Sequence, residues 1–339
     1  MTRILIRATN WIGDAVMSLP AIRAVHARYP EAEISVLARP WVAGLYSREP
    51  AIHRILPYTP KSGPHGLLAK WSAAQALRRE HFDCAILFQN AFEAAAVARL
   101  AGIPRIVGYN RDGRGWLLSP AVPVPRPGEL PLHERFYYLE LLRRADVIDV
   151  FPPDEPIRLS NIEQSAEAGR LHFARLGITG PVIGVSPGAA YGNAKRWLPE
   201  RFAEAARAIA AAQSATVAVF GSAAEQALCE QVANACGGTN LAGRTTLTEF
   251  IGLTAACRLF LTNDSGAMHI AAACGTPAVT VFGSTDHITT GPTGAQARIV
   301  RESVECSPCQ LRECPIDHRC MTRIPAARVV TEALALLKA

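Results

Sequence analysis

The first side chain in the sequence whose type and position suit catalysis is the carboxylate of Asp14. It follows the apolar run 4–6 and a loop that contains Asn10, Trp11 and Gly13. A carboxylate in the first turn of a helix, beside a glycine that allows close backbone approach, can act as a general base that takes a proton from a hydroxyl. The alternative is structural, because Asp also caps helix N-termini and interacts favourably with their dipole.

A second segment, from Ser186 to Trp197, has the composition of a phosphate-binding turn. Gly188 follows an apolar run, and Lys195 and Arg196 come just before an amphipathic stretch. Glycines let backbone N–H groups approach a phosphate, and the cations balance its charge. The segment is not a P-loop, because no Gly-Lys-Ser/Thr closes it, and the chain contains no GxGxxG. Alternatively, the two cations are solvated and the tryptophan anchors the core.

A third segment contains Asp264, Ser265, Gly266 and His269, directly after an apolar run. It predicts a helix start whose backbone amides face an anion. The alternative is a well-formed N-cap with His269 packed in the interface.

Glu225 follows a short Gly-Ser turn after the apolar run 216–220. In nucleotide-binding α/β folds an acid near such a turn binds ribose hydroxyls. The alternative is a first-turn glutamate that stabilises its own helix.

Nine cysteines divide into five scattered in apolar patterns and four crowded into one segment. The scattered ones, which we expect to be buried in a reducing compartment, are Cys84, Cys229, Cys236, Cys257 and Cys274. The crowded ones are Cys306, Cys309, Cys314 and Cys320, with His318 among them. Three interpretations stay open for this segment: a structural metal site, a redox-labile disulfide, or plain packing of a surface loop. None of them implies catalysis.

The elements that must position these residues alternate between strands and helices. Strands are expected over 4–6, 34–38, 55–56 and 84–88, with helices over 14–29, 66–80, 91–101 and 132–144. The pattern restarts with strands over 182–186, 216–220, 259–262 and 278–282, helices over 199–212, 223–235, 247–256 and 265–274, and a terminal helix over 325–338. Strands separated by helices predict two doubly wound parallel sheets. Such sheets bind ligands at the carboxyl ends of their strands, where the segments above lie, and two of them can face each other across a cleft.

Length and composition agree with two globular domains. The chain has 339 residues, 49% of them hydrophobic and 19% charged, which excludes a disordered chain. The proline cluster 151–156 marks the boundary between a domain of residues 1–156 and one of residues 157–339. The start of the chain lacks the uninterrupted apolar region of a secretory signal, and no apolar stretch of membrane-spanning length occurs, so we expect cytoplasmic residence.

The formal net charge of +6 lies mostly in the first half. Residues 1–158 contain 20 basic and 15 acidic residues, a net +5. Most of the basic residues are arginines, which indicates either a GC-rich genome or a surface for an anionic partner. Runs such as Arg78-Arg79 are too short, and lack the interleaved aromatics, for a nucleic-acid surface.

Taken together, four motifs in colinear order resemble the ADP-heptose:lipopolysaccharide heptosyltransferases of glycosyltransferase family 9. They are Asn10-Trp-Ile-Gly-Asp-Ala-Val16, Ala194-Lys-Arg-Trp197, Asn263-Asp-Ser-Gly-Ala-Met-His269 and the Cys-x-Pro-Cys tail that starts at Cys306. The resemblance spans essentially the whole chain. One departure is Pro199, which comes one place later than in the family pattern.

The resemblance implies an inverting GT-B glycosyltransferase with two Rossmann-like domains. Residues 1–156 would bind the acceptor, with Asp14 as general base and Asn10, Trp11 and Gly13 in the acceptor-side loop. Residues 157–339, including the Cys-rich segment 306–320 and a terminal helix, would bind ADP-heptose. The donor-binding residues that the resemblance implies are Ser186, Gly188, Lys195, Arg196, Glu225, Asp264, Ser265, Gly266 and His269. Lys195 would also stabilise the departing phosphates.

The implied reaction transfers L-glycero-D-manno-heptose from ADP-heptose to the first heptose of the lipopolysaccharide inner core. No Asp-x-Asp carboxylate cluster is visible, so we expect no catalytic metal and no cofactor besides the donor substrate. The expected partners are this donor and a heptosylated Kdo-lipid A acceptor at the cytoplasmic face of the inner membrane, with no nucleic acid. The alternatives are another heptosyltransferase step, a different nucleotide-sugar donor, and a nucleotide-sugar-binding protein without turnover.

Overall fold

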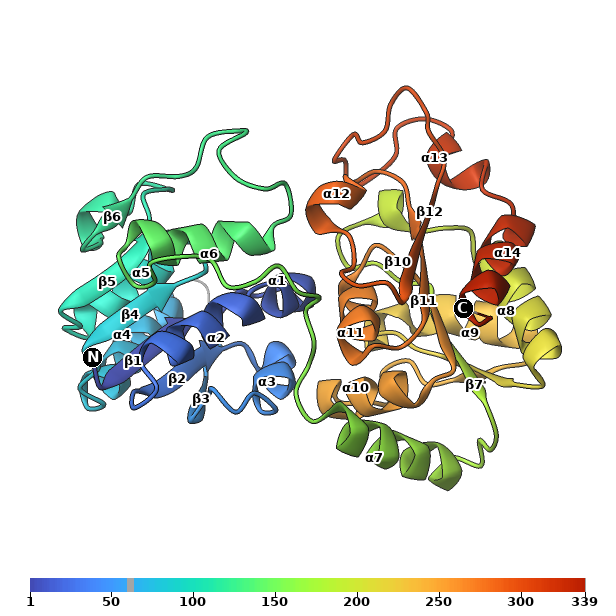
Figure 1. Ribbon diagram of the computed structural model, residues 1–339, viewed down its shortest axis with the longest axis horizontal. Coiled ribbons are helices and arrows are strands. Elements are labelled where there is room, and N and C mark those ends of the chain that lie inside the picture. Colours follow the sequence, from blue (N-terminus) through green and yellow to red (C-terminus); the bar gives the residue numbers. More distant parts are fainter. Residues whose placement is uncertain (60–63, 339) are drawn as a thin grey trace. The chain divides into compact units, whose positions relative to one another are not determined.

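The computed structural model describes residues 1–59 and 64–338, and the chain divides into two compact units, Met1–Asp154 and Glu155–Ala339. The boundary lies inside the proline cluster 151–156. Each unit contains one six-stranded parallel sheet with helices on both faces (Figure 1). The predicted class, two doubly wound α/β domains, is therefore confirmed.

The sheet of the first unit has the strand order β3-β2-β1-β4-β5-β6. Its strands are β1 (Arg3–Arg7), β2 (Glu33–Ala38), β3 (Arg54–Pro57), β4 (Cys84–Leu87), β5 (Arg105–Tyr109) and β6 (Ala121–Val122). Its helices are α1 (Ile12–Met17), α2 (Leu19–Arg28), α3 (Pro40–Tyr46), α4 (Pro64–Arg78), α5 (Phe92–Leu100) and α6 (Arg135–Arg144), with a 3-10 turn η1 (Gly115–Leu117). The direction of strand addition reverses between β1 and β4. The carboxyl ends of these two strands are therefore where this topology provides a ligand site.

The second unit repeats this plan with the strand order β12-β11-β10-β7-β8-β9. Its strands are β7 (Val182–Ser186), β8 (Thr216–Val219), β9 (Thr239–Asn240), β10 (Leu259–Asn263), β11 (Ala278–Phe282) and β12 (Ala297–Arg301). Its helices are α7 (Ile162–Arg175), α8 (Pro199–Gln213), α9 (Gln226–Cys236), α10 (Leu247–Ala256), α11 (Gly266–Cys274), α12 (His287–Thr290), α13 (Arg319–Thr322) and α14 (Ala326–Leu336). Two 3-10 turns, η2 (Asn193–Lys195) and η3 (Ala223–Glu225), follow β7 and β8. The reversal lies between β7 and β10.

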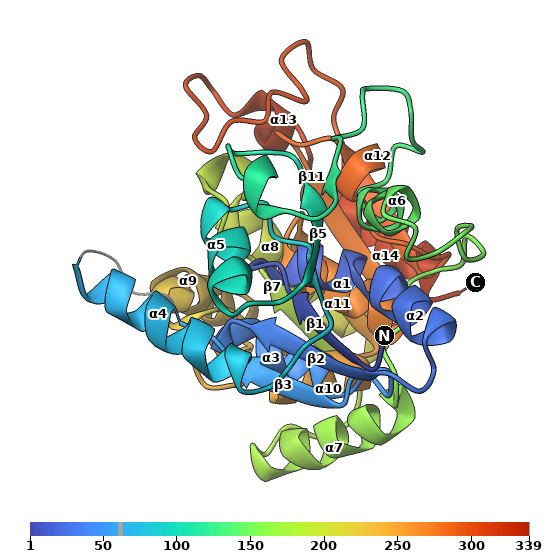
Figure 2. The same cartoon turned by 90° about the vertical axis from the view of Figure 1, so that its left-hand side faces the viewer.

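The cores lie on both faces of each sheet, as a buried parallel sheet requires. In the first unit α4 and α5 cover one face, and α1, α2 and α6 cover the other (Figure 2). In the second unit α8, α9 and α14 pack on one face, and α7, α10 and α11 pack on the other. Within residues 1–59 and 64–338, no helix has both the length and the apolarity to cross a membrane.

The helix predicted over 14–29 forms as two helices, α1 and α2, which meet at Ser18. Pro20 is the physical reason, because it has no N–H to continue the α1 hydrogen-bond ladder and is tolerated only in the first turn of a new helix. The break leaves α1 as a short element, so the loop that precedes Asp14 and the first turn of α1 form one small unit at the end of β1.

Helices α7 and α10 pack so closely that their backbones touch. A Cβ added to Gly169 of α7 would lie 2.0 Å from the carbonyl oxygen of Gly252 in α10. No real side chain tolerates such a contact, so any larger residue must push the helices apart.

We therefore expect Gly169→Ala to lower the free energy of unfolding by about 1–3 kcal/mol, although alanine favours a helix by about 1 kcal/mol over glycine. Chemical denaturation followed by circular dichroism measures this change. Glu167→Ala on the exposed face of the same helix is the control, since its ion pair with Arg170 is solvent-exposed and contributes little. A Gly169→Ala protein as stable as the control would contradict the close packing.

Candidate functional site

A pocket of about 260 Å³ lies at the carboxyl ends of β1 and β4 in the first unit. It is lined by Thr9, Asn10, Trp11, Asp14, Phe88, Gln89, Asn90, Glu134, Tyr137 and Tyr138. Three residues of the predicted acceptor-side motif, Asn10, Trp11 and Asp14, thus share one pocket. Gly13 lies between them in the first turn of α1.

Asp14 is the third residue of α1 and is not its capping residue. Trp11 occupies the N-cap position with extended backbone, and no side chain caps the helix. Asp14 therefore does not occupy the capping position, and its carboxylate in the first turn interacts favourably with the helix dipole. The side chain is partly exposed and lines the pocket, where it can reach a bound molecule.

The loop between β1 and α1 is held by a buried arginine. The guanidinium of Arg7, whose residue is 2% exposed, donates hydrogen bonds to the carbonyls of Ala8 (2.9 Å) and Leu37 (3.1 Å). Burial is the main cause that lowers the pKa of Arg7 to about 10, which leaves it charged at neutral pH. Trp41 Nε1 adds a hydrogen bond to the carbonyl of Asn10 (2.9 Å), so the loop backbone is fixed from two sides.

A second buried arginine supports the opposite wall of the pocket. Arg114 is fully buried and donates to Asn90 Oδ1 (2.9 Å) and to the carbonyl of Gln89. The amide of Asn90 then donates to the hydroxyl of Tyr137 (2.9 Å). The segment after β4 is therefore connected to α6 across the pocket.

Glu134, at the start of α6, is a second carboxyl in this pocket. Burial, followed by the charge of Asp14, raises the pKa of Glu134 to about 7, while Arg111 opposes the shift. Glu134 and Tyr137 also line a neighbouring pocket of about 280 Å³ formed mainly by the proline-rich stretch before α6.

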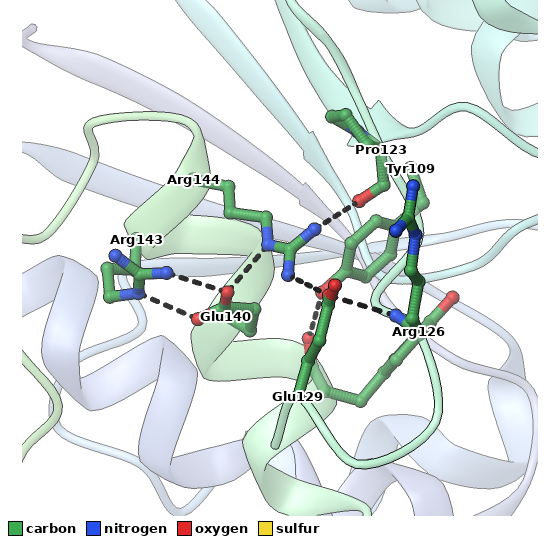
Figure 3. A network of polar contacts seen from close by, with 8 residues as sticks. Tyr109, Pro123, Arg126, Glu129, Glu140, Arg143 and Arg144 are labelled. Atoms are coloured by element: carbon green, nitrogen blue, oxygen red, sulfur yellow. Dashed lines mark hydrogen bonds and ion pairs between the residues drawn. The ribbon is translucent and has the colours of Figure 1, made fainter.

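That proline-rich stretch is attached to α6 by the network in Figure 3. The carboxylate of Glu140, a residue that is 2% exposed, accepts from Arg143 Nε (2.7 Å) and Arg144 Nε (2.6 Å). Arg144 also donates to Glu129 (2.7 Å) and to the carbonyl of Pro123 (3.3 Å). The network fixes the chain that leads into Glu134.

In the second unit, the predicted donor residues lie in the loops after β7, β8 and β10. Asn263, the last residue of β10, is fully buried and connects two of these loops. Its Oδ1 accepts from the backbone N–H of Trp197 (2.9 Å), and its Nδ2 donates to the carbonyl of Pro187 (2.7 Å). The structural interpretation of Trp197 as a core anchor is confirmed, because it is 1% exposed.

Lys195 and Asp264 form an ion pair in which Nζ and Oδ2 are 2.6 Å apart. Their side chains are 13% and 4% exposed, so the interpretation of Lys195 as solvated is wrong. The hydroxyl of Thr285, from the loop after β11, donates to the same carboxylate oxygen. Arg196 lies in the same turn and donates to the carbonyl of Ala189 (3.2 Å).

Helix α11 begins without a side-chain cap. Ser265 occupies the N-cap position with extended backbone, and its hydroxyl hydrogen-bonds with Thr262 Oγ1 (3.2 Å). The prediction of an ordinary side-chain N-cap is wrong, and Gly266 opens the helix. His269 is buried, with 6% of its surface exposed. Whether these amides bind an anion stays a prediction.

Glu225 stabilises its own turn, as the structural interpretation predicted. Its Oε2 accepts from the backbone N–H (2.9 Å) and the hydroxyl (2.8 Å) of Ser222 in a capping box. A Cβ on Gly188 would lie 2.0 Å from Glu225 Oε1, so the loop after β7 passes close to the glutamate at this glycine. Ser186, at the end of β7, is buried. The ribose role of Glu225 stays a prediction.

All nine cysteines are free thiols, and the five scattered ones are buried as predicted. Burial, followed by the neighbouring thiols, raises the pKa of Cys320 to about 11. Among the described residues, no group of three or more His, Cys, Asp and Glu side chains is arranged to hold a metal ion. The structural metal site considered for Cys306, Cys309, Cys314 and Cys320 is therefore not present in this arrangement, and neither is a disulfide.

Sequence reasoning missed several residues of these two sites. Thr285 lies in a small-residue turn after an apolar run, which is the same signal that marked the other loops. Glu134 and Tyr137 carried no local signal, because their place in the pocket depends on how α6 packs.

Comparison with known proteins gives matches over most of the chain. A family model described as glycosyltransferase family 9 (heptosyltransferase) matches residues 70–319. Lipopolysaccharide heptosyltransferase 2 of Escherichia coli K12 is 31% identical, over 88% of either chain. Lipooligosaccharide heptosyltransferase 2 of Haemophilus influenzae Rd is 32% identical, with the same coverage. The solved structure of E. coli ADP-heptose lps heptosyltransferase II has a TM-score of 0.84 at 30% identity, covering 100% of this chain and 99% of that one.

The raised pKa of Glu134 predicts a pH dependence of stability with a definite sign. Between the ordinary pKa of a glutamate, near 4.5, and about 7, the folded protein holds a proton that the unfolded chain releases, so stability falls as the pH rises. We expect Glu134→Gln to remove this loss of stability. As the pH rises from 4.5, the free energy of unfolding of the variant should increasingly exceed that of the wild type, and the difference should level off at about 1–3 kcal/mol above pH 7.

Denaturant titrations from pH 4.5 to 8 measure the difference in the free energy of unfolding between Glu134→Gln and the wild type. The charged groups that face Glu134 are Asp14 and Arg111, which the variant leaves in place. Glu31→Gln, at an exposed glutamate of the same unit, is the control. If the free energies of unfolding of Glu134→Gln and the wild type differ by the same amount at every pH in this range, the raised pKa of Glu134 is contradicted.

Proposed function

The chain belongs to glycosyltransferase family 9, and from this premise we propose that it transfers L-glycero-D-manno-heptose from ADP-heptose to the first heptose of the lipopolysaccharide inner core. The observation that carries the proposal is that the predicted donor residues gather at the carboxyl ends of β7 and β10. Doubly wound sheets bind nucleotides at this reversal point. The similarity to heptosyltransferase 2 proteins over 88% of the chain supports the choice of sugar and step.

We assign donor binding to the second unit. Lys195 contacts the diphosphate through its ammonium, and the uncapped start of α11 at Ser265 and Gly266 offers backbone amides to it. Glu225 binds the ribose through its Oε1, because Oε2 is engaged by Ser222. Arg196 and His269 hold the loop and the helix that carry these groups.

We assign acceptor binding and the base to the first unit. A carboxylate oxygen of Asp14 takes the proton of the acceptor hydroxyl, whose oxygen then attacks the anomeric carbon of the heptose. The bond from that carbon to the phosphate oxygen breaks, and ADP leaves with the bonding electrons. Attack opposite the leaving group inverts the anomeric centre. In this proposal no step requires a metal or a further cofactor.

The acceptor in this proposal is an anionic glycolipid, and the charge of the chain suits it. The net +5 of residues 1–158 favours phosphate and carboxylate groups of an inner-core lipid. We therefore place the protein at the cytoplasmic face of the inner membrane, where such an acceptor is presented.

The function is tested by incubating the purified protein with ADP-heptose and with Kdo-lipid A cores that carry no heptose, one heptose or two. Mass spectrometry of the products should show extension of the one-heptose core alone. Extension of the core without heptose, or of the core with two, would assign a different step. No extension of any core, combined with tight binding of ADP-heptose, would indicate a binding protein without turnover.

Asp14→Ala should lower the transfer rate by about 10²-fold or more, because the acceptor hydroxyl loses its base. The Kd for ADP, measured by calorimetry, should stay within a few-fold of wild type. Asp149→Ala, at an exposed aspartate of the same unit, is the control and should transfer normally. A near-normal rate for Asp14→Ala would remove this residue from the mechanism.

Lys195→Ala should weaken ADP binding by about tenfold or more and lower the transfer rate, because a charge-assisted contact is worth roughly 1.5–3 kcal/mol. The variant also leaves the buried Asp264 without its cation, so Lys195→Ala combined with Asp264→Asn separates the loss of the amine from this new repulsion. Lys338→Ala is the matched control. Unchanged affinity for ADP in Lys195→Ala and in the double variant Lys195→Ala/Asp264→Asn would contradict the role proposed for Lys195.

A further inference from the structure

The charge of Lys195 is already balanced before any donor binds. Its ammonium lies 2.6 Å from the carboxylate of Asp264, and both side chains are largely buried. A nucleoside diphosphate sugar carries a negative charge on each phosphate, so the pair alone offers it a site of zero net charge. A site for this donor therefore needs a further cation.

A second cation, the guanidinium of Arg312, contacts the same aromatic ring as Lys195. Lys195 Nζ lies 4.9 Å from the ring centroid of Tyr191, and Arg312 Cζ lies 5.2 Å from the same centroid. Within the described part of the chain, the guanidinium of Arg312 takes part in no ion pair with a carboxylate. Arg312 is exposed, so its guanidinium is accessible to a ligand. Arg196, the other cation of the turn, donates one hydrogen bond to the carbonyl of Ala189, which holds its side chain against the loop.

Arg312 belongs to the Cys-rich segment, and its backbone is fastened to the loop that carries Lys195. The carbonyl of Arg312 accepts from the N–H of Ala194 (3.0 Å). The hydroxyl of Tyr191 donates to the carbonyl of Gln310 (2.9 Å). A Cβ on Gly192 would lie 2.1 Å from the carbonyl oxygen of Arg312, so the two chains touch at a glycine.

Two more contacts fix the same segment. A ring nitrogen of His318, Nε2, hydrogen-bonds with the carbonyl of Ala194 (3.1 Å). The N–H of Gln310 donates to the carbonyl of Ser284, in the loop after β11 (2.7 Å). The segment thus joins the loops after β7 and β11, whose residues Lys195 and Thr285 both contact Asp264.

We propose that Arg312 is the second cation of the donor site and binds the diphosphate together with Lys195. The Cys-rich segment then has a function that its cysteines did not reveal, which is to hold this arginine against the Tyr191 ring. A planar guanidinium suits a phosphate, and stacking on the ring orients it at low entropic cost. The inference rests on the proposed function, since it concerns the same donor.

The test measures ADP binding by calorimetry at several salt concentrations in wild type, Arg312→Gln and Arg312→Lys. Arg312→Gln should weaken ADP binding by about tenfold and reduce the salt dependence of Kd, because one charged contact is lost. Arg312→Lys keeps the charge and should retain most of the affinity. Arg323→Gln, which makes the same charge change at another exposed site of this unit, should bind ADP like the wild type.

Affinity of Arg312→Gln within twofold of wild type would overturn the inference. A weaker affinity with unchanged salt dependence would also overturn it, because that result indicates a structural role. Failure of the wild type itself to bind ADP would instead contradict the proposed function, so the two failures are distinguishable.

Discussion

The amide of Asn263 is the interaction on which the geometry of the second unit's site depends. It is fully buried at the end of β10, and both of its polar ends are used, one by Trp197 and one by Pro187. Any other placement of these loops would leave a buried donor or acceptor without a partner, at a cost of about 1–3 kcal/mol for each group. The next residue in the chain is Asp264, so the amide also sets where this carboxylate meets Lys195.

The ion pair that results is better understood as a positioning device than as a source of stability. Removing two charges from water offsets most of their attraction, so a buried pair contributes little net free energy to folding. It does keep the long side chain of Lys195 in one place before a ligand arrives, which reduces the entropy lost on binding. The same pairing cancels the charge that a diphosphate requires. In the proposed site, the helix amides of α11 and Arg312 add the attraction that the pair alone lacks.

Local sequence signals determined most elements, and tertiary contacts determined what the signals missed. The limits predicted for β7, α10 and β11 agree with the structure, because apolar runs there end at clear turn residues and α10 has a capping box between Thr246 and Glu249. Strand β12 was missed because two arginines interrupt its short apolar run and it lies at an edge of the sheet. Lys195 and Asp264 were predicted from glycine-rich turns, but their pairing required the order of β7 and β10 in the sheet. Glu134 and Arg312 had no local signal at all, since each gains its role from a partner far away in the sequence.

The pocket of the first unit adds a constraint on any base that works there. Two carboxyls, Asp14 and Glu134, line one cavity, and like charges in a partly desolvated space cannot both ionise without cost. The raised pKa of Glu134 eases this conflict, because the group keeps its proton to a higher pH than an ordinary glutamate does. A protonated Glu134 removes the repulsion and can donate a hydrogen bond. The buried Arg7 and Arg114 fix the two walls from which this pocket is built.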